Sequence, residues 1–178
     1  EPAALVATCS VVANVSCNGG TDGAADVTAS GGTAPYTGTG SFTGLAAGTY
    51  TYNVSDANGC TATCSVTITE PAALVATCSV TANVSCNGGS DGSADVTASG
   101  GTAPYTGTGS FTGLAAGSYT YNISDANGCT ASCSVTITEP AALVATCSVV
   151  SNVTCNDGSD GSADVTASGG TAPYPGAG

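Results

Sequence analysis

The sequence predicts an all-β protein, built as a tandem array of disulfide-stapled β-sandwich repeats of 69 residues. Three observations lead to this prediction. A nearly identical unit recurs along the chain, apolar and hydroxyl side chains alternate with a period of two, and each full unit contains four cysteines. Recurrence indicates an array of similar domains, alternation indicates half-buried strands, and an even cysteine count indicates disulfides.

A single sequence unit recurs every 69 residues. The run EPAALVATCSV begins at Glu1, Glu70 and Glu139, and the first two units differ at only six positions. We therefore expect repeat 1 at residues 1–69, repeat 2 at residues 70–138 and a partial, truncated repeat 3 at residues 139–178. The Glu-Pro pairs suit the boundaries, because proline is poorly placed inside a sheet.

Alternating patterns place the strands within a repeat. In the first unit, apolar side chains alternate with polar ones over residues 5–11, 25–29, 49–55 and 60–69. A period of two puts the apolar set on a core face and the hydroxyls on the solvent face. Clusters of Asn-Gly, Asp-Gly and Gly-Gly separate these segments, as turns do. Short strands at this spacing favour a β-sandwich.

The composition excludes most catalytic chemistry. The chain has no Lys, Arg or His, and its twelve acidic residues give a formal charge of −12. General acid–base catalysis, activation of a nucleophile and phosphoryl transfer usually need the missing side chains, so we expect no enzyme. Nucleic-acid binding is largely an effect of Lys and Arg, and an anionic membrane would repel this chain. We expect neither a nucleic-acid partner nor membrane insertion.

The cysteines are expected to form disulfides outside the cytosol. A 69-residue unit of small side chains buries little apolar area and needs covalent staples. The preferred pattern is nested, with partners for Cys147 and Cys155 outside the segment. An alternative keeps the Cys17–Cys60 type of pair but links neighbouring repeats through Cys64–Cys78 and Cys133–Cys147. Zinc binding is a third alternative, disfavoured by the spacings. The preferred pairs are Cys17–Cys60, Cys9–Cys64, Cys86–Cys129 and Cys78–Cys133.

Four runs of the first repeat carry a family resemblance. They are NVSCNGGTDG from Asn14, ASGGTAPY from Ala29, LAAGTY from Leu45 and VSDANGC from Val54. Together they resemble the SprB-type repeat of Bacteroidetes surface adhesins and related secreted repeat proteins. The resemblance implies an immunoglobulin-like β-sandwich, a secreted or cell-surface location and an adhesive or filament-building role. It also supports pairing of Cys17 with Cys60.

Two departures from the family pattern matter. Residues 37–40 read Thr-Gly-Thr-Gly, where the family often has aromatic residues. Cys9 and Cys64 are additional cysteines. The first departure argues against an aromatic ligand platform, and the second suggests a repeat selected for toughness.

Hydroxyl and amide side chains are candidates for glycan attachment. Dense Ser and Thr suit O-linked glycans, although Thr is also simply a good strand residue. The N-x-Ser/Thr pattern marks N-linked acceptors, although it also arises by chance in a chain rich in these residues. The O-linked candidates are Thr33, Thr37, Thr39, Thr43, Thr61, Thr63, Thr67 and Thr69, and the N-linked candidates are Asn14, Asn53, Asn83, Asn122 and Asn152.

Aspartates in the turn segments are candidate calcium ligands. Carboxylate oxygens suit Ca²⁺, and an acidic chain without bases attracts cations. The spacing matches no complete calcium loop, and Asp-Gly pairs are also ordinary turn formers. The candidates are Asp22, Asp26, Asp56, Asp91, Asp95 and Asp125.

These features predict a structural role in an extracellular filament or the stalk of a surface adhesin, with glycan decoration. The expected partners are neighbouring repeats of the array, other copies in a fibre and surface glycans. The alternative is an adhesive module that binds glycans or another surface and is stabilised by calcium. Tyr36 and Phe42 distinguish the two: a binding module would expose them, whereas a filament would cover them.

Overall fold

Every regular element of the protein is a β-strand in the part that the computed structural model describes, residues 3–174. This confirms the all-β class predicted from the alternating pattern. None of the described residues forms a helix with the length and apolarity that crossing a membrane requires.

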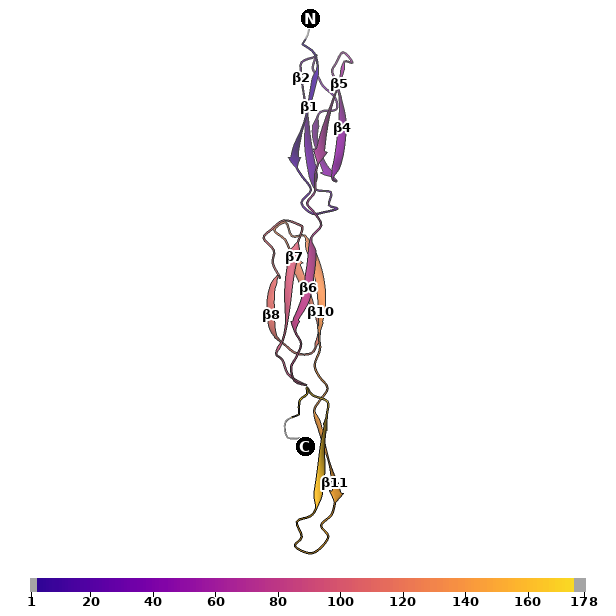
Figure 1. Ribbon diagram of the computed structural model, residues 1–178. Coiled ribbons are helices and arrows are strands. Elements are labelled where there is room, and N and C mark those ends of the chain that lie inside the picture. Colours follow the sequence, from indigo (N-terminus) through magenta and orange to yellow (C-terminus); the bar gives the residue numbers. More distant parts are fainter. Residues whose placement is uncertain (1–2, 175–178) are drawn as a thin grey trace. The chain divides into compact units, whose positions relative to one another are not determined.

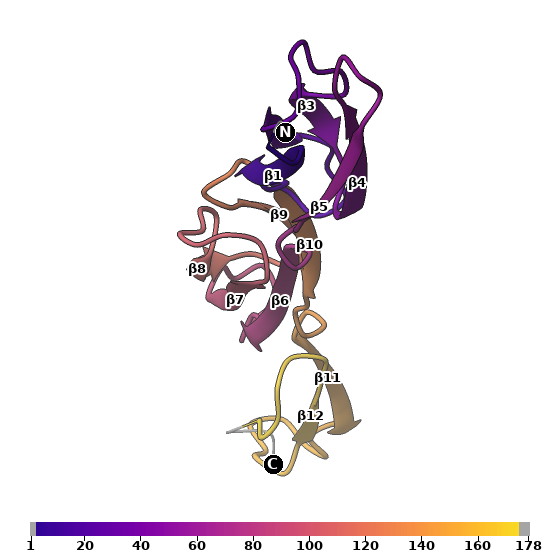
Figure 2. The same ribbon diagram turned by 90° about the horizontal axis from the view of Figure 1, so that it is seen from above.

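The first repeat folds into two small antiparallel sheets (Figure 1). One sheet has the order β1-β2-β3, formed by Val6–Ala13, Gly23–Ser30 and Gly40–Leu45. The other pairs β4, Gly48–Ser55, with β5, Thr61–Ile68. Figure 2 shows the same strands from above. The sheets pack through contacts of β1 and β2 with β5, which makes a β-sandwich of five strands, smaller than the seven-stranded immunoglobulin domain.

Alternation along the strands sets which residues form the core. On β5, Val66 and Ile68 are buried, while the Thr side chains between and beside them are exposed. The period of two in the sequence therefore predicts correctly which face of β5 is buried. The central cluster of the first repeat consists of Val15, Ala25, Val66 and Ile68, with Cys9, Leu45, Tyr50 and Tyr52 packed around it.

The second repeat reproduces this arrangement. Its first sheet has the order β6-β7-β8, formed by Val75–Ala82, Gly92–Ser99 and Gly109–Leu114. Its second sheet pairs β9, Gly117–Ser124, with β10, Thr130–Ile137. The buried apolar positions recur 69 residues further along the chain, at Val84, Ala94, Val96, Ile123, Val135 and Ile137.

The last described segment has one antiparallel hairpin, β11 (Val144–Ser151) and β12 (Ser162–Ser168). It corresponds to β1 and β2, and its register matches theirs. No further strand follows β12 in the described part of the chain. Val165 is consequently 42% exposed, whereas its counterparts Val27 and Val96 are each 2% exposed.

Contacts between residues group the chain into two compact units, and the second repeat is divided between them. The first unit combines the chain up to Ala76 with residues 98–106 and 122–131. The second contains residues 77–97 and 107–121 and the chain from Ser132 onward. The 69-residue domain boundaries of the sequence analysis remain a prediction.

Three local expectations need correction. The predicted strand segments omit β3, in which Phe42 pairs with Ala25 of β2. Val11 is 43% exposed, because a bulge between Val11 and Ala13 breaks the alternation at the end of β1. Cys60 is exposed, because β5 begins one residue later.

Candidate functional site

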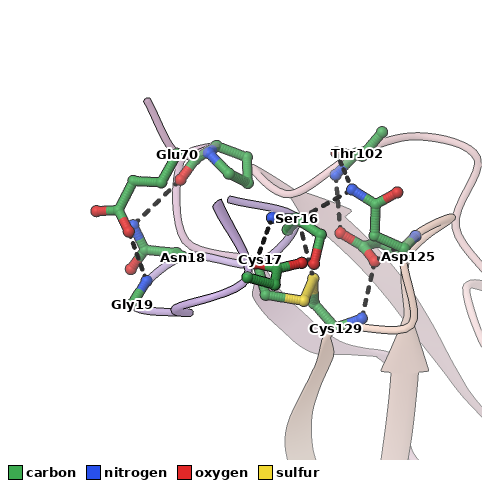
Figure 3. The surroundings of a disulfide bond; sticks show 11 residues. Ser16, Cys17, Asn18, Gly19, Glu70, Thr102, Asp125 and Cys129 are labelled. Atoms are coloured by element: carbon green, nitrogen blue, oxygen red, sulfur yellow. Dashed lines mark hydrogen bonds between the residues drawn. A yellow bond between two sulfur atoms is a disulfide. The ribbon is translucent and has the colours of Figure 1, made fainter. Parts of the chain in front are cut away.

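The structure contains three disulfide bonds. Cys9 bonds Cys64, which joins β1 to β5, and Cys78 bonds Cys133, which joins β6 to β10. These are the two within-repeat pairs that join strands. The third bond joins Cys17 of the first repeat to Cys129 of the second, with Cα atoms 5.7 Å apart (Figure 3).

The third bond corrects the expected Cys17–Cys60 and Cys86–Cys129 pairs. The chain near Cys17 lies at the end of β5, since Val15 donates its N–H to the Thr69 carbonyl at 2.9 Å. Cys60 lies before the start of the same strand. Eight strand residues span about 26 Å, far beyond the roughly 7 Å Cα separation that a disulfide allows. Cys17 and Cys60 therefore cannot meet within one sandwich.

The alternative pairs Cys64–Cys78 and Cys133–Cys147 are also wrong. Cys64 and Cys133 are already bonded within their own repeats. The idea behind this alternative, a disulfide between neighbouring repeats, holds for a different pair of cysteines.

The loop that carries Cys17 is shaped by its own hydrogen bonds. Gly20 donates its N–H to the Cys17 carbonyl at 2.9 Å, which closes a turn. The Asp22 carboxylate accepts the Ser16 N–H at 3.0 Å. Hydrogen bonds from the Ser16 hydroxyl and N–H hold the pKa of Asp22 below its ordinary value.

The same loop donates hydrogen bonds to the start of the second repeat. Gly19 donates its N–H to the Glu70 carboxylate at 2.6 Å, and the Asn18 side-chain amide donates to the Pro71 carbonyl at 3.1 Å (Figure 3). Gly88 and Asn87 hold Glu139 and Pro140 in the same way. The sequence analysis interpreted Glu-Pro only as a boundary, although its strict recurrence at the start of every repeat was a usable signal.

The loop that carries Cys129 is organised by a buried carboxylate. Asp125 is 6% exposed. One of its oxygens accepts the N–H groups of Asn127 and Cys129, each at 2.9 Å, and the other accepts the Thr102 N–H at 2.9 Å. Burial alone would raise the pKa of this carboxyl, but the N–H groups of Thr102, Cys129 and Asn127 outweigh burial and lower the pKa.

Glycine makes room for this carboxylate. Gly101 has φ of +56°, and a Cβ at this position would lie 2.6 Å from the Asp125 carboxylate. Gly32 has the same φ, and a Cβ there would lie 2.7 Å from the Asp56 carboxylate. Both the left-handed backbone and the close approach require glycine, which explains the second glycine of the Gly-Gly pair in the first two repeats.

The two loops meet at the disulfide. The Asn127 side-chain amide donates to the Ser16 carbonyl at 2.9 Å and to the Thr102 hydroxyl at 3.1 Å. Figure 3 shows Ser16 beside the sulfur atoms of the Cys17–Cys129 bond. The Cys17–Cys129 bond is therefore embedded in a hydrogen-bonded contact between the two repeats.

The glycan candidates are mostly solvent-exposed. The exposed hydroxyl candidates are Thr37, Thr39, Thr43, Thr61, Thr63, Thr67 and Thr69, and the five asparagines Asn14, Asn53, Asn83, Asn122 and Asn152 are exposed as well. Thr33 is half-buried, and its hydroxyl accepts a hydrogen bond from Asn58. Asn14 and Asn83 use their side-chain oxygens to accept N–H groups of Thr69 and Thr138. Glycan attachment remains a prediction.

The candidate calcium ligands make hydrogen bonds to separate partners within the protein. Asp22 and Asp91 accept hydrogen bonds from the N–H groups of Ser16 and Ser85, respectively. Asp26 and Asp95 accept them from the hydroxyls of Ser41 and Ser110. Asp56 and Asp125 accept them from the N–H groups of Cys60 and Cys129 in their own loops. Within residues 3–174, no three acidic, cysteine or histidine side chains gather as a metal site would require. Asp22, Asp56, Asp91 and Asp125 shape their loops, whereas Asp26 and Asp95 lie within strands β2 and β7. Calcium binding remains a prediction.

The two aromatic residues that distinguish the functional hypotheses make internal contacts. The Tyr36 hydroxyl donates to the Gly31 carbonyl at 2.6 Å. Phe42 stacks on Tyr52 with ring centroids 4.3 Å apart. Both Tyr36 and Phe42 are half-buried.

The comparison with protein families finds a matching repeat model. The SprB repeat matches residues 9–37, 78–106 and 147–175. Each match runs from the first cysteine of a unit through its Gly-Gly and Ala-Pro-Tyr runs, and successive matches lie 69 residues apart. No match to a curated protein was found.

Proposed function

We propose that this chain, which carries three SprB repeats, is a structural segment of an extracellular filament or of a surface-adhesin stalk. The Cys17–Cys129 disulfide is the observation that carries the proposal. A bond between repeats serves little purpose in an isolated recognition domain, whereas an array under tension needs each repeat fastened to the next.

The disulfides shorten the covalent path along the chain. Cys9 and Cys17 are eight residues apart, Cys129 and Cys133 are four apart, and the Cys17–Cys129 bond bypasses a sequence separation of 112 residues. Force applied beyond these positions passes through the sulfur atoms and not through the bypassed sandwich core. The array therefore resists extension even when a sandwich loses its packing.

The environment and the partners follow from the same bonds. Disulfides persist in oxidising surroundings, which supports a secreted or surface-attached location. Neighbouring repeats and other copies in a fibre are the proposed partners, and glycans on the exposed hydroxyl faces would hydrate them. The half-buried Tyr36 and Phe42 favour this role over surface binding. We propose no enzymatic activity, since the chain lacks His, Lys and Arg.

Single-molecule pulling tests the mechanical role. The chain is held by handles attached outside residues 9 and 133, and extended with and without a reductant. In a variant with Cys9, Cys64, Cys78 and Cys133 replaced by serine, no other disulfide bypasses the chain, and reduction of the Cys17–Cys129 bond should add a sequence separation of 112 residues, about 370–400 Å of contour length. Equal extension with and without the reductant would contradict the proposal.

Immunolabelling of intact cells tests the location. Antibodies raised against the repeat should label the surface or detached fibres without permeabilisation. Labelling that requires permeabilised cells would contradict the extracellular assignment.

A further inference from the structure

Each of the first two repeats contains two Asn-Gly pairs, a dipeptide at which a protein chain can modify itself without an enzyme. The glycine nitrogen can attack the side-chain carbonyl carbon of the asparagine, because glycine has no side chain to hinder the approach. Whether the attack occurs depends on how the folded chain holds the two groups. The pairs are Asn18-Gly19, Asn58-Gly59, Asn87-Gly88 and Asn127-Gly128.

At Asn18-Gly19, the Glu-Pro segment that opens the second repeat occupies both reacting groups. The Gly19 N–H donates to the Glu70 carboxylate at 2.6 Å, and the Asn18 side-chain amide donates to the Pro71 carbonyl at 3.1 Å. The attacking nitrogen is therefore fixed against Glu70, and the amide group that would leave is fixed against Pro71.

The turn at this position also keeps the two groups apart. Gly20 donates its N–H to the Cys17 carbonyl at 2.9 Å, and φ is +74° at Gly19 but negative at Asn18. These features define a type II turn, in which ψ of the second residue, here Asn18, is about +120°. At this ψ the Gly19 nitrogen points away from the Asn18 Cβ, whereas a five-membered ring closes only when the two eclipse each other. Cyclisation therefore requires the turn to open.

The pair Asn87-Gly88 is held in the same way by the next Glu-Pro segment. The Gly88 N–H donates to one Glu139 carboxylate oxygen at 2.6 Å. The Asn87 side-chain amide donates to the other oxygen of Glu139 and to the Pro140 carbonyl, each at 3.1 Å. The φ of Gly88 is +75°, close to that of Gly19, so the arrangement recurs in the second repeat.

The other two Asn-Gly pairs are held within their own loops. Gly59 donates its N–H to the Asp56 backbone carbonyl, and Gly128 donates to the Asp125 backbone carbonyl, each at 3.1 Å. Neither bond involves a Glu-Pro segment. The four pairs therefore divide into two that depend on the start of the next repeat and two that do not.

We propose that Asn18 and Asn87 are sites of spontaneous deamidation, and that the Glu-Pro segment of the following repeat protects them. While the segment is in place, the turn stays closed and the asparagine survives. When the segment leaves, the turn opens, and modification proceeds in proportion to the population of the open turn. The inference goes beyond the proposed mechanical role, because the protection acts whether or not the array carries tension.

The reaction balances with water as its only co-reactant. A bond forms between the Gly19 nitrogen and the Asn18 Cγ, and the bond between Cγ and Nδ2 breaks. Nδ2 leaves as ammonia and takes the proton of the Gly19 N–H, so a cyclic imide remains. Water then adds to one of the two imide carbonyls and opens the ring, which leaves aspartate or isoaspartate in place of Asn18.

The product cannot rebuild the contact. A carboxylate in place of the Asn18 amide has no hydrogen to donate to the Pro71 carbonyl. It would also lie beside the Glu70 carboxylate in a chain that has no Lys or Arg to neutralise the pair, and like charges repel each other. Deamidation therefore leaves a permanent chemical mark on a junction that has opened.

A Glu70→Ala variant of the full chain tests the proposal. The folded, oxidised wild type and the variant are incubated at mildly alkaline pH, and deamidation at each pair is followed by mass spectrometry of chymotryptic peptides. We expect the rate at Asn18 to rise about fivefold, because the closed turn loses one hydrogen bond. Asn87 is the internal control, since its own partner Glu139 is unchanged. A Glu139→Ala variant should exchange the behaviour of the two asparagines.

A Glu70→Gln variant separates local protection from a general loss of folding. Its side-chain carbonyl can still accept the Gly19 N–H, so Asn18 should react at close to the wild-type rate. An unchanged Asn18 rate in Glu70→Ala would overturn the proposal. A slower rate would also overturn it, because Glu70 would then act as a base that promotes the attack. An equal rise at Asn18, Asn58 and Asn87 would overturn it as well, because protection would then come from the whole fold and not from Glu70.

Discussion

At the residue scale, a buried aspartate organises each loop that precedes a closing strand. Asp56 and Asp125 are 8% and 6% exposed, and each accepts three backbone N–H groups. In a chain with no bases, backbone N–H groups provide the compensation that a salt bridge would otherwise supply. The two loops differ in one respect, since Cys129 is bonded across the junction and Cys60 is free.

The Asp125→Asn substitution should therefore impair the junction. The side-chain NH₂ group of asparagine would face one of the backbone N–H donors and could not accept its hydrogen bond. The loop would then lose its shape, and Cys129 would lie less often within bonding distance of Cys17. We expect more free thiol at Cys17 after oxidative refolding, measured by alkylation and peptide mass. Asp56→Asn is the matched control, because it disturbs the equivalent loop without a disulfide partner. Equal loss of the Cys17–Cys129 bond in both variants would contradict this account.

Acid should destabilise the protein through these carboxylates. The pKa values of Asp22, Asp56, Asp91 and Asp125 are lowered in the folded state by hydrogen bonds. A lowered folded pKa gives stability that is complete above the unfolded value of about 3.9 and lost as the pH falls through the folded value. Urea midpoints should fall below about pH 4. They should stay level between about pH 5 and 8, because no histidine titrates there. A constant midpoint down to pH 2 would rule out this linkage.

At the element scale, the strands follow the alternation in the sequence closely. The faces of β4 and β5 could be predicted from the period of two, because one face of each is buried in a sandwich only two sheets thick. Strand β3 could not be predicted, because its sequence Gly-Ser-Phe-Thr-Gly-Leu has few strand formers. It is held by pairing with β2 and by Phe42 on Tyr52.

The cysteine pairing shows where sequence reasoning fails. The order of cysteines along the chain predicts a nested pattern, and it says nothing about which end of the sandwich each loop occupies. That position depends on Val15 lying beside Thr69, a contact between residues 54 positions apart. Long-range contacts of this kind decide that Cys17 faces the next repeat and that Cys60 does not.

A core substitution tests the sandwich packing. Ile68 is 1% exposed in the central cluster of the first repeat. Ile68→Ala should lower the free energy of unfolding by about 2–5 kcal/mol, because it removes buried carbon and leaves a cavity. Val12→Ala is the control, since Val12 is 59% exposed and should change stability by less than about 0.5 kcal/mol. Urea denaturation measures both, and equal effects would contradict the assigned core.

At the scale of the whole molecule, three disulfides overlap along the chain. The Cys17–Cys129 loop begins inside the Cys9–Cys64 loop and ends inside the Cys78–Cys133 loop. Strand-to-strand bonds stabilise each sandwich, and the longer bond ties one repeat to the next. Repetition of this scheme gives an array in which neighbouring repeats are joined twice, by the backbone and by a disulfide.

Removal of a strand-to-strand disulfide should be costly for a core this small. The Cys9→Ser, Cys64→Ser double variant should lose about 4 kcal/mol of stability, since its loop spans 55 residues. Calorimetry measures the change. The Cys147→Ser variant serves as the control, because Cys147 is free and exposed. A comparable loss in both would show that the bond contributes little.

Disulfide mapping of the oxidised, non-reduced chain tests the central claim most directly. Proteolysis between the cysteines, followed by fragmentation that cleaves sulfur–sulfur bonds, identifies each partner. We predict a fragment that joins Cys17 to Cys129, and free thiols at Cys60, Cys86, Cys147 and Cys155. Fragments that join Cys17 to Cys60 and Cys86 to Cys129, with free thiols only at Cys147 and Cys155, would contradict the claim that a disulfide joins neighbouring repeats.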